Sequence, residues 1–117
     1  MLDILFGSKN AERVLQFLLA RDNAYAREIA LFYDVSPSVI KKQLEKFETG
    51  SIIVGRDIGN MRIYELNKRN PFIKELSALL IKSRSTYDSK ERAKLVRKDR
   101  SRPRSKNKPL IQRRDDN

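Results

Sequence analysis

The stretch from residue 26 to residue 50, AREIALFYDVSPSVIKKQLEKFETG, predicts two helices joined by a tight turn. The segment 34–36, Asp-Val-Ser, interrupts the first apolar pattern, and Ser36-Pro37 restarts it. A serine side chain can cap the free amides of a new helix, and proline suits the first helical position because no amide hydrogen is needed there. We therefore expect a helix-turn-helix, a motif whose second helix can enter the major groove of DNA.

The second helix of this pair has two unlike faces. Apolar residues recur at helical spacing and predict a buried face: Ile40, Leu44 and Phe47. The opposite face carries Ser38, Lys41, Lys42 and Glu45. We expect this polar face to be open and to contact DNA, the alternative being an ordinary solvated helix face. Lysine and serine are versatile donors, so no base sequence follows from them.

A β-hairpin is predicted directly after this helix. Two strand-like runs, residues 51–57 and 61–67, are rich in β-branched residues or alternate polar and apolar side chains. Gly59-Asn60 between them is typical of a hairpin turn. Arg56 and Arg62 flank the turn from opposite strands, so the hairpin is expected to be a basic wing that contacts DNA. Alternatively, the two arginines pair with neighbouring carboxylates, Asp57 and Glu65.

The segments before this unit predict further core elements. The apolar arm 1–6 is expected either to cover its own core or to join a dimer contact. Ser8 caps a predicted helix over residues 9–21, in which Gln16 is expected to face outward. The expected buried stripe is Ala11, Val14, Leu15 and Leu18, and Phe17 and Leu19 widen the apolar surface, so this helix is expected to be contacted on two sides. Residues 24–26 fit a short strand that pairs with the wing, and a helix follows over 27–33.

The recognition helix is expected to end at Gly50, in a left-handed conformation. After the hairpin, Asn70-Pro71 predicts the start of another helix, which runs to about residue 83. Four of its apolar side chains are expected to face the domain: Phe72, Leu76, Leu79 and Leu80. Ile73 and Ile81 are then left for another contact, either the N-terminal arm or the same helix of a second copy. Two-fold dimers suit palindromic DNA sites, so a homodimer is expected.

The charge is concentrated at the C-terminal end. The chain of 117 residues has a formal net charge of +11, and residues 84–117 hold 13 basic and 5 acidic side chains. We therefore divide the chain into a winged-helix domain, residues 1–83, and a basic tail, residues 84–117, helical at first and disordered from about residue 100. Such a surplus of positive charge favours nucleic acid as the partner. The tail is expected to be a phosphate clamp or, alternatively, a solubilising end.

Composition also excludes several classes of function. The chain has no cysteine and no histidine, so disulfides, cysteine nucleophiles, histidine bases and the usual zinc sites are absent. We expect no enzymatic activity, no cofactor and no metal. No apolar run approaches the roughly 20 residues of a membrane span, and we expect no secretory signal. A cytoplasmic location, associated with a prokaryotic or archaeal nucleoid, is expected.

The run from residue 5 to residue 71 resembles the prokaryotic winged helix-turn-helix transcriptional regulators of the MarR/ArsR-like kind. The shared features are an LFGSK opening, a VSPSVIKKQLEKFE recognition helix and an IYELN closing strand. The resemblance implies a mainly α fold with a small β-wing. It departs at Asp34, where glycine is more usual, at Val39, where threonine or serine is common, and in the basic tail.

The resemblance also implies which residues touch DNA. On the recognition helix and its start these are Ser36, Pro37, Ser38, Val39, Lys41 and Lys42. On the wing they are Arg56, Asn60 and Arg62. Tyr25 and Arg27 would meet phosphates from the side, although Tyr25 alternatively belongs to the core.

Three functions compete on these observations. The first is a sequence-specific DNA-binding transcriptional regulator, a repressor that occupies a palindromic site of double-stranded DNA as a homodimer. The second is a non-sequence-specific or accessory DNA- or RNA-binding protein with an architectural, replication or mobile-element function. The third is a protein–protein interaction module built on the same fold.

Overall fold

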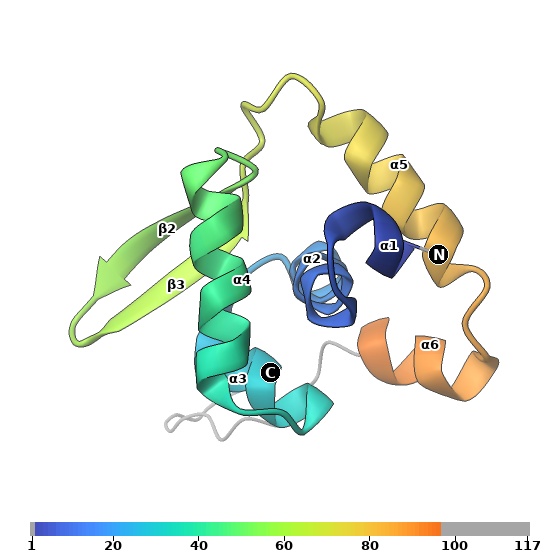
Figure 1. Cartoon of the computed structure of the whole chain (residues 1–117), viewed down its shortest axis with the longest axis horizontal. Helices are drawn as coiled ribbons and strands as arrows, with labels where there is room; N and C mark the ends of the chain where they lie inside the picture. Colours follow the sequence, from blue (N-terminus) through green and yellow to red (C-terminus); the bar gives the residue numbers. More distant parts are fainter. Residues whose placement is uncertain (1, 97–117) are drawn as a thin grey trace, which may run out of the picture.

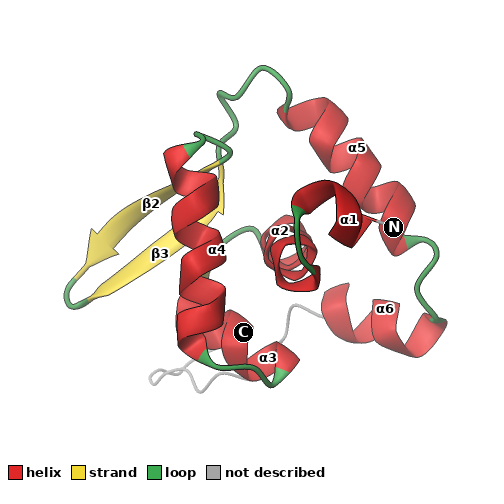
Figure 2. Ribbon diagram, in the orientation of Figure 1, coloured by secondary structure: helices red, strands yellow, loops and turns green. Residues whose placement is uncertain are grey.

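A computed structural model describes residues 2–96 of the chain, which form six helices and a three-stranded sheet (Figures 1 and 2). The helices are α1 (Leu2–Phe6), α2 (Lys9–Arg21), α3 (Ala26–Tyr33), α4 (Pro37–Thr49), α5 (Ile73–Arg84) and α6 (Ser89–Val96). The strands are β1 (Ala24–Tyr25), β2 (Ile53–Ile58) and β3 (Met61–Leu66). The predicted class, mainly α with a small β-wing after a helix-turn-helix, is confirmed.

Helix α2 is the centre of the fold. In Figure 1 it is seen nearly end on, with the other helices arranged around it and the β2–β3 hairpin projecting beyond α4. The Ser8 side chain accepts a hydrogen bond from the Ala11 amide at 3.0 Å, as a helix cap does. Because α2 is enclosed on several sides, most of its residues from Val14 to Ala20 are buried rather than one stripe alone.

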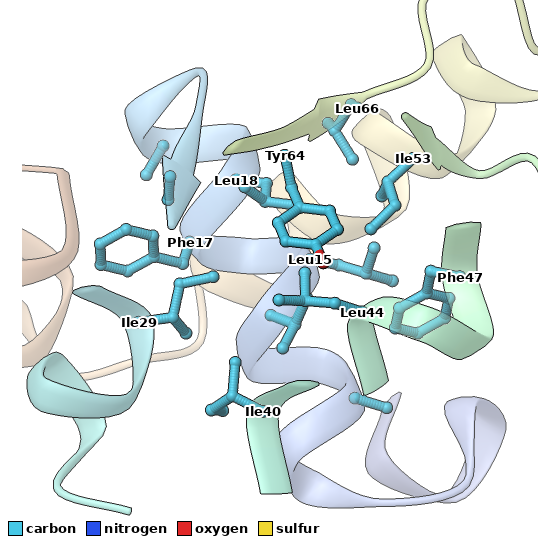
Figure 3. Close-up of a cluster of buried hydrophobic side chains, with 14 of the residues drawn as sticks. Leu15, Phe17, Leu18, Ile29, Ile40, Leu44, Phe47, Ile53, Tyr64 and Leu66 are labelled. Carbon is cyan, nitrogen blue, oxygen red and sulfur yellow. The ribbon is translucent and has the colours of Figure 1, made fainter. Parts of the chain in front are cut away.

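The core joins the helix-turn-helix to the sheet through α2. Figure 3 shows side chains of α4 and of the two hairpin strands converging around Leu15. The three residues predicted to form the buried face of α4, namely Ile40, Leu44 and Phe47, are all buried there. Removing such apolar surface from water is the main force that holds the helix in place.

The turn between α3 and α4 depends on one left-handed residue. Asp34 has φ 57° and ψ 51°, a conformation that aspartate adopts more readily than most residues. The Val35 amide then donates to the Ala30 carbonyl at 3.0 Å, and the chain enters α4. The expected cap by the Ser36 side chain is not made, because its hydroxyl lies 3.2 Å from the Ser38 hydroxyl instead.

The sheet has the order β1-β3-β2, with antiparallel pairing throughout. Tyr25 of β1 pairs with Ile63, so the short first strand joins the wing as predicted. Ile58 pairs with Met61 across the turn, where Gly59 has φ +61°. We use "wing" for the β2–β3 hairpin, residues 53–66.

Several detailed predictions were wrong. Gly50 is not the left-handed residue after α4, since its φ is −84° and the positive φ belongs to Ser51. Gln16 does not face solvent: it is fully buried, and its Nε2 donates to the Leu80 carbonyl of α5 at 2.8 Å. Phe72 and Ile73 exchange roles, since Phe72 is 72% exposed while Ile73 packs against the core.

Helix α6 lies beyond residue 83, where we placed the end of the winged-helix domain. It packs on α2, and Leu95 is only 2% exposed. The Arg21 side chain of α2 donates from Nε to the Leu95 carbonyl at 3.0 Å and from Nη2 to the Lys94 carbonyl at 3.3 Å. The packed unit therefore reaches residue 96, whereas the tail predicted to be disordered from residue 100 lies outside the described residues.

Candidate nucleic-acid interface

The outward face of α4 is open along its first two turns. Ser38, Val39, Lys41 and Lys42 are all exposed. Within the described residues neither lysine takes part in an ion pair. Both ammonium groups are consequently available to an anionic partner.

The same helix is held rigidly from behind. Its inner face is in the core, and its last turns are tied to the N-terminal arm by Lys46, whose Nζ donates to the Phe6 carbonyl at 2.9 Å. Lys46 therefore differs from Lys41 and Lys42, because its charge is already used in a contact within the molecule. A face that is open in front and fixed behind can present side chains with little loss of entropy on binding.

The start of α4 is also accessible. Ser36 and Pro37 are exposed, and Ser36 has the extended backbone typical of the residue before a helix. The positive end of the helix dipole lies here, where a phosphate is favoured. The predicted contacts at this end of the helix thus lie on one continuous surface with Ser38 and Lys41.

The wing has an inner face toward α4 and an outer face toward solvent. The register places Arg56 on the outer face, opposite Ile63, and its side chain is exposed without an ion pair among the described residues. Asn60 is exposed in the turn at the end of the hairpin. Arg56 and Asn60 are thus both accessible, and their contact with DNA stays a prediction.

Arg62 is in a different environment from Arg56. It lies on the inner face, directly opposite Asp57, and its Nη1 donates to Asp57 Oδ1 at 2.8 Å. Its Nη2 donates to Glu48 Oε2 of α4 and to the Gly55 carbonyl, the latter at 3.2 Å. Hydrogen bonds to Glu48 and Asp57 raise the pKa of the guanidinium above its usual value. The alternative of carboxylate pairing therefore applies to Arg62, with Glu48 and Asp57 as its partners rather than Glu65.

The two flanking residues lie on either side of the boundary between β1 and α3. Arg27 is exposed in the first turn of α3, whereas Tyr25 is half-buried beside the wing. The Tyr25 amide is 3.4 Å from Glu28 Oε1, which caps the start of α3. Arg27 is thus accessible to phosphate, and Tyr25 has only part of its ring at the surface.

Two residues that sequence reasoning missed organise this region. Glu48 lies one turn after Glu45, the last residue of the predicted outward face of α4. Its carboxylate is directed toward the wing, where it accepts a hydrogen bond from Arg62. A Cβ atom added at Gly55 would lie 2.7 Å from Arg62 Nε, so the missing side chain makes room for the arginine. No sequence signal marks either residue, because both roles depend on how closely the wing approaches α4.

The described residues show neither a metal-binding cluster nor a long apolar helix. Within residues 2–96, the acidic side chains form no group of three or more that could hold a metal ion. Nor is any helix in that part of the chain long and apolar enough to cross a membrane.

Comparison with solved structures supports the winged-helix fold. The structure of Lactococcus lactis ZitR, as a double mutant in apo form, aligns with a TM-score of 0.51 at 24% identity, over 68% of this chain and 63% of that one. A single mutant of ZitR aligns with a TM-score of 0.52 at 22% identity, over 74% of this chain and 60% of the other. A further ZitR structure, described as a zinc-responsive MarR family member, aligns at 20% identity with a TM-score of 0.48, over 73% of this chain and 66% of that one.

This chain therefore has a winged-helix fold like that of ZitR, and it spans a little under two thirds of the first two ZitR chains. No protein-family model matches the sequence, and no curated protein sequence matches it.

Proposed function

We propose that this protein is a sequence-specific DNA-binding transcriptional regulator that represses by occupying its site. The observation that carries the proposal is the outward face of α4, where Ser38, Lys41 and Lys42 are exposed while the opposite face is fixed in the core. An α-helix with an open polar face fits the major groove of B-form DNA.

The wing supplies the second contact of the proposal. Arg56 and Asn60 extend along the hairpin beyond α4, and Arg27 lies at the start of α3. These side chains would bind phosphates and fix the register of α4 on the duplex, whereas α4 itself would read base edges. Neither a metal nor a cofactor is part of the proposal.

Two copies of the chain would bind a palindromic site. Exposed apolar side chains outside the α4 face support this part of the proposal: Ile4 and Leu5 of α1 are 84% and 62% exposed, and Ile81 of α5 is 50% exposed. Apolar groups of this kind are more common in interfaces between protein subunits than on isolated surfaces. Light scattering should give twice the mass of one chain, and a single-chain mass both with and without DNA would contradict the dimer.

Selection from a pool of random duplexes at physiological salt tests the proposal. We expect one palindromic sequence to be enriched. The variant with Lys41→Gln and Lys42→Gln should lose that enrichment and keep its thermal unfolding temperature, because both side chains are exposed. A matched control, Lys82→Gln with Lys90→Gln, removes the same charge from α5 and α6 and should keep the enrichment.

The basic tail favours a second candidate, an accessory DNA- or RNA-binding protein without sequence preference. The net charge of residues 84–117 is +8, which suits non-specific binding to phosphates. Binding without enrichment in the same selection would support this candidate and contradict the regulator. Failure to bind any duplex or RNA would contradict both.

A further inference from the structure

The guanidinium of Arg62 connects three segments of backbone. It belongs to β3, bonds Asp57 and the Gly55 carbonyl of β2, and reaches Glu48 in the last turn of α4. An arginine has a planar group with several donors, so one side chain can hold two carboxylates in fixed directions. This group is thus a direct polar link between α4 and the wing.

The surroundings of Arg62 are shaped for this link. The Cβ position of residue 55 would be 2.7 Å from Arg62 Nε and 3.1 Å from a ring carbon of Tyr64, so a side chain there would displace the arginine. The ring of Tyr64 lies below the guanidinium, with 6.0 Å from Cζ to the ring centroid. The Arg62 and Glu48 side chains are 38% and 31% exposed, so the pair is partly shielded from water.

A link of this kind matters because β1 pairs only with Ile63 and Tyr64, so the end of the wing is a two-stranded hairpin, which has little stability of its own. The wing extends away from the helices beyond α4, as Figure 1 shows, and the turn residues at its end are exposed. Contacts from α4 and from the wing can be made on one duplex only if the angle between them is right. Fixing that angle before binding avoids an entropy cost at the moment of association.

We propose that Arg62 positions the wing relative to α4 and does not itself bind a DNA phosphate. This inference rests on the proposed function, and it assigns Arg56 and Arg62 different roles although both are basic residues of the same hairpin. Glu48 acts with Arg62 as its partner on α4, and Gly55 is required for the arginine to reach that partner.

The variant Glu48→Ala distinguishes positioning from direct contact. It removes a negative charge near the duplex and leaves Arg62 free of its α4 partner. Direct contact by Arg62 therefore predicts equal or tighter DNA binding, whereas positioning predicts weaker binding by about tenfold, since a charged hydrogen bond that orders the wing is lost. The matched control is Glu45→Ala, which removes the same charge from an exposed site of α4 that has no ion pair among the described residues. It should bind as tightly as the unchanged protein or more tightly.

Salt dependence gives a second readout that does not depend on the loss of affinity. Each phosphate contact contributes about 0.9 to the slope of log affinity against log salt. Arg56→Gln should reduce that slope by about this amount, whereas Arg62→Gln should lower affinity with the slope unchanged. Glu48→Ala added to Arg62→Gln should cause no further loss, because the two residues act as one pair. Amide exchange of residues 53–66 should be faster in both Arg62 and Glu48 variants, with α2 unchanged.

The possible results distinguish failure of the positioning role of Arg62 from failure of the proposed function. If the unchanged protein binds no duplex, both the proposed function and the positioning role are overturned. If it binds and Glu48→Ala binds at least as tightly, only the positioning role is overturned. A slope reduced by about 0.9 in Arg62→Gln would also overturn it, since Arg62 would then be a phosphate contact.

Discussion

Helices α4 and α6 both pack a leucine into the same core, yet different interactions hold them there. Helix α4 has 13 residues and buries Ile40, Leu44 and Phe47 on one face. Helix α6 has 8 residues and buries Leu95 alone. The first is fixed by a continuous apolar face, whereas the second depends on a few contacts made by distant residues.

Those distant contacts come mainly from Arg21 of α2. Its guanidinium donates to the last carbonyls of α6 and lies over the Phe17 and Phe32 rings, with 4.8 Å and 5.3 Å from Cζ to the ring centroids. A cation at a helix C-terminus also compensates the negative end of the helix dipole. A short helix with one apolar anchor can therefore be ordered by another element that binds its end.

The largest expected effect on unfolding free energy is that of Leu44→Ala. Leu44 belongs to α4 and is fully buried in the core, so the change should destabilise the whole domain by about 3 kcal/mol through lost burial and a cavity. Urea unfolding measures this loss, and DNA affinity should fall with it. A loss below about 1 kcal/mol would show that α4 is not held by its apolar face.

Leu95→Ala should cost less, about 1–2 kcal/mol, because α6 can detach without unfolding the rest. Hydrogen exchange should become faster in residues 89–96 while α2 keeps its protection. Equal destabilisation by Leu44→Ala and Leu95→Ala, with exchange raised throughout, would remove the contrast between the two helices.

Tyr87→Phe should cost about 1 kcal/mol. The Tyr87 hydroxyl, in the connection between α5 and α6, donates to Glu12 Oε2 at 3.0 Å, and Glu12 also accepts from the Ser83 hydroxyl. Chemical unfolding at neutral pH measures the loss. An unchanged stability would indicate that this hydrogen bond does not help to hold α6.

The same variant changes the response to alkali. Burial and the hydrogen bond to Glu12 raise the pKa of Tyr87 above its usual value of 10.0, and burial raises the pKa of Tyr33. The unfolded chain then loses these protons first, so stability present below pH 10 decreases as the pH rises above it. Tyr87→Phe should show a smaller decrease than the unchanged protein.

Deleting residues 98–117 should have the smallest effect on unfolding free energy, since the sequence of this segment offers few apolar side chains to bury. The deletion should instead reduce the salt slope of DNA binding, because basic side chains that release counterions are removed, and leave sequence preference intact. Binding to the selected duplex and to a scrambled one, across salt concentrations, measures both. Loss of preference would show that the tail takes part in reading bases.

The two arginines of the wing show where sequence reasoning stopped. The hairpin was predicted from its β-branched runs and from Gly59-Asn60, and the pairing of Ile58 with Met61 on either side of these two residues confirms the turn. Sequence alone gave Arg56 and Arg62 the same role, because both flank the turn. Their difference follows from the side of the sheet on which each lies and from the approach of Glu48.

Gln16 is a residue of the core whose burial could not be predicted from the sequence. Its place with Glu12 and Arg13 on the polar side of an amphipathic helix predicted exposure. Here α5 covers that side, and the Leu80 carbonyl accepts a hydrogen bond from Gln16 Nε2, which would otherwise be buried without a partner.

Local signals along the chain were enough to predict three elements: the helix-turn-helix with its Ser36-Pro37 start, the buried face of α4 and the hairpin turn. Caps, periodicity and turn residues act over a few positions, so they can be recognised along the chain. Tertiary structure alone decided that α6 docks through Arg21 and Leu95, that Gln16 is buried and that Arg62 bonds Glu48. Each of these depends on groups 14 or more residues apart meeting in space, and no local pattern specifies such a meeting.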